Sequence, residues 1–323
     1  MAPRPAERGS TPGHDLRGRV LRVHGGVYEV ETAPGRIVEA ALRGRLKREQ
    51  RTGDRVVAGD EVLVREHEDG SVTIEAVEPR RSELARRAPG RGRRGRRQQA
   101  RIIVANVDQV VAVFAAAEPE PHLRMLDRFL VLAEANSLDA VVLVNKLDLA
   151  DEAATRALFR RYEDAGYPVL LTSAVTGRGV DALADRLRGA TSVLSGPSGV
   201  GKSSLLNAIE PELELPTAEI SDAVGKGRHT TVTARLIRLP HGGYVADTPG
   251  LRELGLWGVS PDELRTCFPE FHEPAAHCRF GNACTHSHEP DCAVREGVEA
   301  GGIHPERYSS YLAMLKSETL DEA

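Results

Sequence analysis

One octapeptide, residues 196–203, limits what this chain can fold into more than any other feature. Its sequence, Gly-Pro-Ser-Gly-Val-Gly-Lys-Ser, matches the G-x-x-x-x-G-K-[ST] pattern of phosphate-binding loops. The apolar run 191–194 predicts a strand before it, and residues 204–209 predict a helix after it. In this context, backbone N–H groups and the positive end of the helix can surround phosphate oxygens. The expected phosphate-binding residues are Gly196, Pro197, Ser198, Gly199, Val200, Gly201, Lys202, Ser203 and Ser204.

Two side chains of this loop have expected roles of their own. Lys202 is expected to reach the β- and γ-phosphates as a catalytic residue, and the Ser203 hydroxyl is expected to bind Mg²⁺. The alternative is a Gly-rich turn before a helix with a purely structural role. Because Lys and Ser stand in register after the glycines, the pattern favours nucleotide binding.

A second motif indicates which base is bound. The apolar run 139–144 ends in Asn145-Lys146-Leu147-Asp148, which resembles the guanine-reading Asn-Lys-x-Asp element of GTPases. A carboxylate at Asp148 can accept from N1–H and the exocyclic amine of guanine, and adenine lacks that donor pair. By the same resemblance, Asn145 contacts the base edge and the Lys146 stem lies over the ring. Alone, the tetrapeptide could be an ordinary turn; beside a phosphate-binding loop it predicts a guanine nucleotide.

Two shorter segments complete the expected nucleotide site. Residues 171–174 follow an apolar run and resemble the loop that closes over guanine, with Ser173 and Ala174 beside the base. The segment Asp247-Thr-Pro-Gly250 resembles the D-x-x-G element at the γ-phosphate. There, Asp247 would hold the metal through water, and the Gly250 N–H would contact the terminal phosphate.

Residues 225–231, Gly-Lys-Gly-Arg-His-Thr-Thr, are the expected first switch. Either Thr230 or Thr231 would bind Mg²⁺ together with the serine of the phosphate-binding loop. Many GTPases orient the attacking water with a Gln directly after D-x-x-G, whereas this chain has Leu251 there. We therefore take His229 as the candidate catalytic residue; a purely structural role for it is the alternative.

The order of these motifs is unusual. A conventional GTPase has the phosphate-binding loop first and the base motif later, but here the base motif comes first. Ligand-binding groups lie at the carboxyl ends of parallel strands whatever the chain order, and the two ends of a domain are often close together. The alternating strand and helix patterns of residues 102–255 therefore predict a circularly permuted α/β GTPase domain.

The chain before this domain has a different pattern. Residues 15–80 contain about five short alternating segments separated by turn signals, typical of a small OB-type β-barrel. Such a barrel either binds nucleic acid or serves only in packing and protein docking. Residues 81–101 are expected to be an Arg-rich linker with eight Arg and no acid from residue 86 onward; without those charges the net charge of −4 would be −12. This segment predicts a polyanionic partner, and nucleic acid is the favoured one.

Residues 256–323 predict a small helical module with a metal site. Three Cys and one His occur within fifteen residues: Cys278, Cys284, His286 and Cys292. This set suits one structural zinc ion per chain, with all four positions filled by protein. The alternatives are free thiols, a disulfide, or His277 or His288 in place of His286.

The overall composition is that of an ordinary globular protein, with 41% hydrophobic and 28% charged residues in a chain of 323. No apolar run reaches membrane-spanning length, and residues 1–14 are polar and rich in Pro and Gly. We therefore expect a disordered tail at 1–14, a cytoplasmic location and no membrane partner.

Together, these motifs resemble one family of bacterial GTPases that depend on the small ribosomal subunit, the RsgA or YjeQ family. The resemblance covers the chain from residue 15 onward and rests on the barrel, the nucleotide motifs and the Cys/His cluster. It implies a multidomain monomer that hydrolyses GTP to GDP with Mg²⁺, acts late in maturation of the 30S subunit, binds 16S rRNA near the decoding region and is stimulated by the subunit. The alternative is an RNA-binding assembly protein that uses GTP as a conformational ligand with little turnover, which the missing Gln supports.

Overall fold

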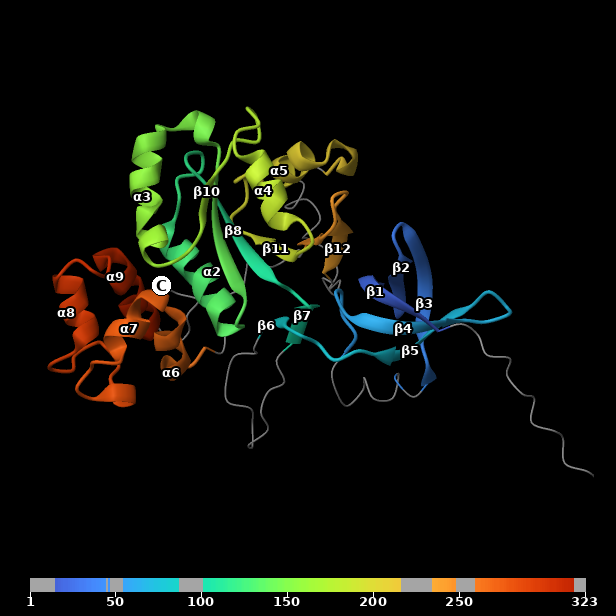
Figure 1. Ribbon diagram of the computed structural model, residues 1–323, viewed down its shortest axis with the longest axis horizontal. Helices are drawn as coiled ribbons and strands as arrows, with labels where there is room; N and C mark the ends of the chain where they lie inside the picture. The colour runs from blue at the N-terminus through green and yellow to red at the C-terminus, as the bar shows by residue number, and fades with distance from the viewer. Residues whose placement is uncertain are drawn as a thin grey trace, which may run out of the picture.

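The computed structural model describes residues 15–44, 46, 55–86, 101–215, 234–247 and 259–316. Figure 1 shows three parts in a row: a β-barrel on the right, a helix-covered sheet in the middle and a small helical module on the left. Several predictions fall outside the described residues. These are the tail 1–14, the Arg-rich segment 87–100, the switch residues His229, Thr230 and Thr231, and Gly250.

The barrel is closed by five strands in the order β1-β2-β3-β5-β4, with β4 pairing back to β1. Each strand contributes buried apolar residues to one core, among them Val20, Val30, Val64 and Ile74. Neighbouring strands are antiparallel except β3 and β5. This arrangement confirms the OB-type barrel. The strands are β1 (Asp15–His24), β2 (Val27–Ala33), β3 (Arg36–Leu42), β4 (Glu61–Glu66) and β5 (Val72–Val77).

The central sheet has the strand order β10-β9-β8-β11-β13-β12, and all of its pairs are parallel except β12 with β13. The central strand β8 is buried along its whole length, as its continuous apolar sequence predicts. The strands are β8 (Gln109–Ala115), β9 (Asp139–Asn145), β10 (Val169–Leu171), β11 (Thr191–Ser195), β12 (Arg235–Arg238) and β13 (Tyr244–Asp247).

Helices cover both faces of this sheet, as the alternating pattern predicts. One face packs against α2 and α3 through Leu126, Leu130, Phe159 and other apolar residues. The other face packs against α4 and α5 through residues such as Leu183 and Leu205. The helices are α2 (Leu123–Ala135), α3 (Glu152–Asp164), α4 (Val180–Leu187) and α5 (Lys202–Ile209), with short 3₁₀ turns η1 (Leu147–Leu149) and η2 (Pro211–Leu213).

The linker prediction for residues 81–101 is wrong at its two ends. Strand β6 (Glu83–Arg86) pairs antiparallel with β7 (Arg101–Ala105), so both ends of the predicted linker lie in a two-stranded sheet. The reason is apolar burial: Leu84 and its partner Val104 are both fully buried in the core under α2. The domain boundaries otherwise stay a proposal.

Polar contacts join the barrel to the sheet. Strand β1 pairs with β12 at Arg22 and Arg235, and the Arg19 guanidinium donates to the Thr191 hydroxyl at 3.1 Å. The Asn106 side chain donates to the Gly59 carbonyl at 2.9 Å, inside the protein. The barrel therefore rests on the end of the sheet where β11 begins.

The C-terminal module consists of short helices packed around aromatic residues. Phe268 and Phe271 stack at 5.0 Å between ring centroids, and Tyr311 meets both edge-on. Among the described residues, no helix is both long and apolar enough to span a bilayer. The elements are α6 (Pro261–Leu264), η4 (Arg265–Cys267), η5 (Pro269–Phe271), α7 (His272–Ala275), η6 (Gly281–Ala283), α8 (Ala293–Glu299) and α9 (Pro305–Lys316).

Candidate guanine-nucleotide site and metal centre

The phosphate-binding loop lies between β11 and α5, as predicted. Its glycines adopt conformations that L side chains rarely take, with φ of +149° at Gly196 and +92° at Gly201. A Cβ on Gly196 would lie 2.0 Å from the Val113 carbonyl oxygen, so only Gly lets the loop pass this close to β8. Gly201 is the N-cap of α5, which turns the first N–H groups of the helix toward the loop.

The Lys202 ammonium lies over this loop. Its Nζ donates to the Gly196 carbonyl at 2.8 Å and to the Pro197 carbonyl at 2.7 Å. Ser203 and Ser204 follow in the first turn of α5 and are half-buried, while Ser198 and Gly199 at the loop tip are exposed. The loop therefore presents a cation, hydroxyls and backbone N–H groups at one edge of the sheet.

Asn145 connects the base motif to the phosphate-binding loop. It ends β9, and its buried Nδ2 donates to the Val200 carbonyl at 2.9 Å. Its Oδ1 accepts from the Ala174 N–H at 3.1 Å. A Cβ on Gly201 would lie 2.4 Å from Asn145 Nδ2, which gives a second reason for Gly at this position. One side chain thus contacts both the phosphate loop and the base-closing loop.

The other base-motif residues lie at the same edge. The Ser173 hydroxyl donates to the exposed Asp148 carboxylate, and the Ser173 side chain is itself buried. Lys146 has a φ of +60°, and its Nζ donates to the Glu118 carbonyl. Leu147 is buried and anchors the motif, with its N–H donating to the Thr172 carbonyl at 3.1 Å. Glu118 is a site neighbour that the motif patterns do not reveal.

Asp247 is the described residue of the D-x-x-G element. It is the last residue of β13, which pairs in parallel with the strand that leads into the phosphate-binding loop. Parallel strands bring their carboxyl ends to one edge, so Asp247 and the loop share that edge. The roles of Gly250, His229, Thr230 and Thr231 stay predictions, because these residues lie outside the described ranges.

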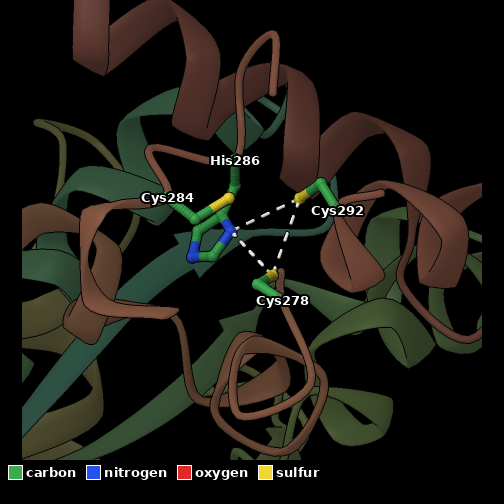
Figure 2. Close-up of side chains that lie close together, drawn as sticks. All are labelled: Cys278, Cys284, His286 and Cys292. Carbon is green, nitrogen blue, oxygen red and sulfur yellow. Dashed lines mark hydrogen bonds between the residues drawn. The ribbon is translucent and has the colours of Figure 1, made fainter. Parts of the chain in front are cut away.

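The predicted metal ligands lie together in the C-terminal module (Figure 2). The ligand atoms of Cys278, Cys284, His286 and Cys292 lie within 4.8 Å of one another, and all four residues are buried. His286 Nδ1 is 3.6 Å from Cys278 Sγ and 3.5 Å from Cys292 Sγ, and the two sulfurs are 3.8 Å apart. His277 and His288 are exposed outside this cluster, so His286 is the imidazole that faces the thiols.

The three distances among Cys278, His286 and Cys292 fit the edges of a tetrahedral metal site. Metal–sulfur bonds of about 2.3 Å and metal–nitrogen bonds of about 2.0 Å give tetrahedral S–S edges of about 3.8 Å and S–N edges of about 3.5 Å. Burial raises the pKa of the Cys284 thiol to about 12 and also raises the pKa of Cys292. Buried thiolates therefore need a compensating cation, and the Cys₃His cluster could hold a metal ion.

The permuted motif order and the shared sheet edge define the class of this protein: it is a circularly permuted GTPase with a barrel before the enzyme domain and a module with a Cys₃His cluster after it. A sequence model of the family described as RsgA GTPase matches residues 77–257. The chain belongs to the RsgA family of GTPases, and it is a hydrolase of that kind.

Individual relatives are similar to this chain along nearly its whole length. A protein of Gemmatimonas aurantiaca named small ribosomal subunit biogenesis GTPase RsgA is 53% identical over 299 residues, covering 92% of this chain and 95% of the relative. A protein of the same name from Moorella thermoacetica is 43% identical over 300 residues, covering 93% and 96%. The crystal structure of YjeQ from Thermotoga maritima is similar with a TM-score of 0.76, at 37% identity and coverage of 94% and 98%. YloQ, described as a circularly permuted GTPase, gives a TM-score of 0.72 at 31% identity, with 94% of each chain covered.

Proposed function

We propose that this chain hydrolyses GTP to GDP and phosphate during late maturation of the 30S ribosomal subunit, binds 16S rRNA and is stimulated by the subunit. The name of its relatives supports the ribosomal role. The observation that carries the guanine assignment is the pair of Asn145 contacts, to Val200 and Ala174. These contacts put the base motif beside the phosphate-binding loop despite the reversed motif order.

In this proposal, the chain works mainly by positioning and charge neutralisation. Asp148 reads the guanine edge, and Ser173 holds its carboxylate in place. Lys202 and the N–H groups at the start of α5 neutralise the phosphates. Ser203, with Thr230 or Thr231, would hold the Mg²⁺ that comes with GTP, which screens phosphate charge when bound.

The residue that orients the attacking water is a separate proposal. Leu251 stands where a Gln would do this in many GTPases, so slow intrinsic turnover is expected. We assign the water-orienting role to His229. If His229→Ala keeps full subunit-stimulated turnover, another group performs this role.

The Cys₃His cluster is proposed to hold one structural zinc ion. All four positions are filled by protein, so no open position is left for catalysis. The ion would cross-link the segment 278–292 and so stabilise a module that consists mostly of short helices.

The Arg-rich segment and the barrel are proposed to contact rRNA, with the protein acting as a cytoplasmic monomer. Arg suits phosphate through its planar donor fork. Neutralising several of the Arg between residues 86 and 101 should weaken RNA binding and flatten its dependence on salt, since fewer phosphate contacts release fewer counterions. An unchanged salt slope would contradict this contact.

One experiment separates the proposal from the alternative, a GTP-switched assembly protein with little turnover, which Leu251 supports. Multiple-turnover phosphate release is measured alone and with isolated 30S, 50S and 70S particles. Stimulation by 30S supports the proposal. Binding to 30S without turnover supports the alternative, and stimulation by 50S alone contradicts the assignment to the small subunit.

A further inference from the structure

Arg307 is the largest fully buried side chain among the described residues, and it joins the C-terminal module to the GTPase domain. Its Nη1 donates to Asp127 on α2 at 2.7 Å. Its Nε and Nη2 donate to Glu270 in the module at 2.7 and 3.1 Å. The three side chains are only 1%, 3% and 6% exposed.

This buried triad connects the two parts through fully paired charges. A planar guanidinium can bind two carboxylates at once, which a lysine ammonium does poorly. The guanidinium also lies 4.7 Å from the centre of the Phe268 ring and 5.6 Å from that of Tyr162, on opposite sides of the interface. Separating α9 from α2 would leave buried charges without partners, which is strongly unfavourable.

The next residues of α9 bind the metal loop. The Tyr308 hydroxyl donates to the His286 carbonyl at 2.6 Å, and the Tyr311 hydroxyl donates to the Thr285 carbonyl at 2.6 Å. Helix α9 therefore holds the ligand loop with two tyrosines and α2 with Arg307. An ordered ligand loop therefore provides two of the hydrogen bonds that hold α9.

Helix α2 leads to the nucleotide site. His122 caps its first turn by accepting from the Met125 N–H at 3.2 Å. Just before the cap, the Glu118 carbonyl accepts from Lys146 of the base motif. Asp127 lies one turn beyond Leu123, the first residue of the helix, and Glu118 lies on the segment that leads into this first turn.

We propose that Arg307 is a positioning residue for the guanine-nucleotide site: through Asp127 it fixes α2, and through α9 it makes nucleotide affinity depend on the occupied Cys₃His cluster. This inference rests on the guanine assignment of residues 145–148. It assigns the module a role inside the enzyme, in addition to any contact it makes with a partner.

The test measures GDP affinity by titration with a fluorescent GDP analogue in the metal-loaded and chelated full-length protein. Metal content and hydrogen exchange of residues 123–127 are followed in parallel. Chelation should weaken GDP binding of the wild type by about 5-fold to 150-fold, the usual range for coupled sites. It should also raise exchange at the start of α2, and re-added Zn²⁺ should reverse both changes.

Variants of the triad distinguish coupling between the metal cluster and the nucleotide site from a loss of protein stability. Arg307→Lys keeps the charge but not the fork, so the metal-loaded variant should bind GDP as weakly as the chelated wild type while retaining its metal. Should it fail to fold, the triple variant Asp127→Asn, Glu270→Gln, Arg307→Met removes the whole triad without stranding a charge, and chelation should then no longer affect GDP affinity. Glu306→Gln is the matched control, since this mostly exposed neighbour on α9 pairs with Arg161 across the same interface. It should keep the wild-type response.

Equal GDP affinity of the loaded and chelated wild type would overturn the inference. Loss of GDP binding in both forms would reject the guanine assignment instead. Hydrogen exchange tests whether the effect of chelation passes through α2. Unchanged exchange in α2 after chelation would overturn the link between the metal loop and α2.

Discussion

Replacing Asn145 with Ala should separate the base motif from the phosphate-binding loop. The substitution removes the 2.9 Å bond to the Val200 carbonyl and the 3.1 Å bond from the Ala174 N–H. It leaves the backbone of β9 unchanged. Because Asn145 is only 2% exposed, little water can replace the lost side-chain groups.

The size of the effect follows from these two contacts. A buried polar group left unsatisfied costs about 1–3 kcal/mol. Val200 is buried, so its carbonyl should bear a cost in that range, whereas Ala174 is half-buried and can bind water, which puts its cost near the lower limit. The total of about 2–4 kcal/mol corresponds to a melting-temperature decrease of roughly 4–16 °C for a domain of this size. GDP affinity should also fall by at least about tenfold, since the two loops no longer hold each other.

Thermal unfolding and GDP titration test this reasoning, with Thr172→Val as the control. Thr172 is fully buried beside Asn145, but its hydroxyl contacts are long, at 3.3 and 3.4 Å. The control should therefore change either measurement only slightly. An Asn145→Ala protein that melts and binds GDP like the wild type would refute the view that Asn145 couples these loops.

Three further predictions concern the base, the metal and pH. Asp148→Asn should shift binding from guanine to xanthine nucleotides, measured by competition titration; unchanged preference would mean that Asp148 does not contact the base. Cys292→Ser should lower the bound zinc from one per chain and destabilise the module, whereas Cys267→Ser, in the same module but outside the cluster, should retain the metal. Burial raises the pKa of Glu134, so its charge destabilises the folded state progressively as pH rises above the unfolded value near 4.5. Glu134→Gln should therefore raise the melting temperature at pH 7, by no more than about 3 °C because the group is partly solvated, and should leave it unchanged at pH 4.

The elements that sequence reasoning predicts best are those whose own residues determine them. Strands β9 and β11 follow from short apolar runs that end in motif residues. The convergence of Asn145, Lys202 and Asp247 follows from a general property of parallel sheets rather than from local sequence. For this reason, the reversed motif order does not hinder the prediction.

Sequence reasoning does not predict the contacts between segments that are far apart along the chain. Arg307 and Asp127 are separated by 180 residues, and no local pattern pairs them. A signal does exist in α9, because Arg307 shares the spacing of the buried residues Tyr311 and Met314, which places a charged residue in an apolar stripe. Strand β6 is not predicted for a related reason. Its four residues pair with β7, which follows the Arg-rich segment, so no local pattern marks them as a strand.

The permutation gives the C-terminal module two connections to the nucleotide site. One is covalent, since β13 ends at Asp247 and the chain enters the module at Val259. The other runs from the base motif through α2 to Arg307. In a GTPase whose base motif came last, the γ-phosphate strand would instead continue into the enzyme domain. Here, the chain order joins Asp247 to the module, and the module also contacts α2 through the buried Arg307–Asp127 pair.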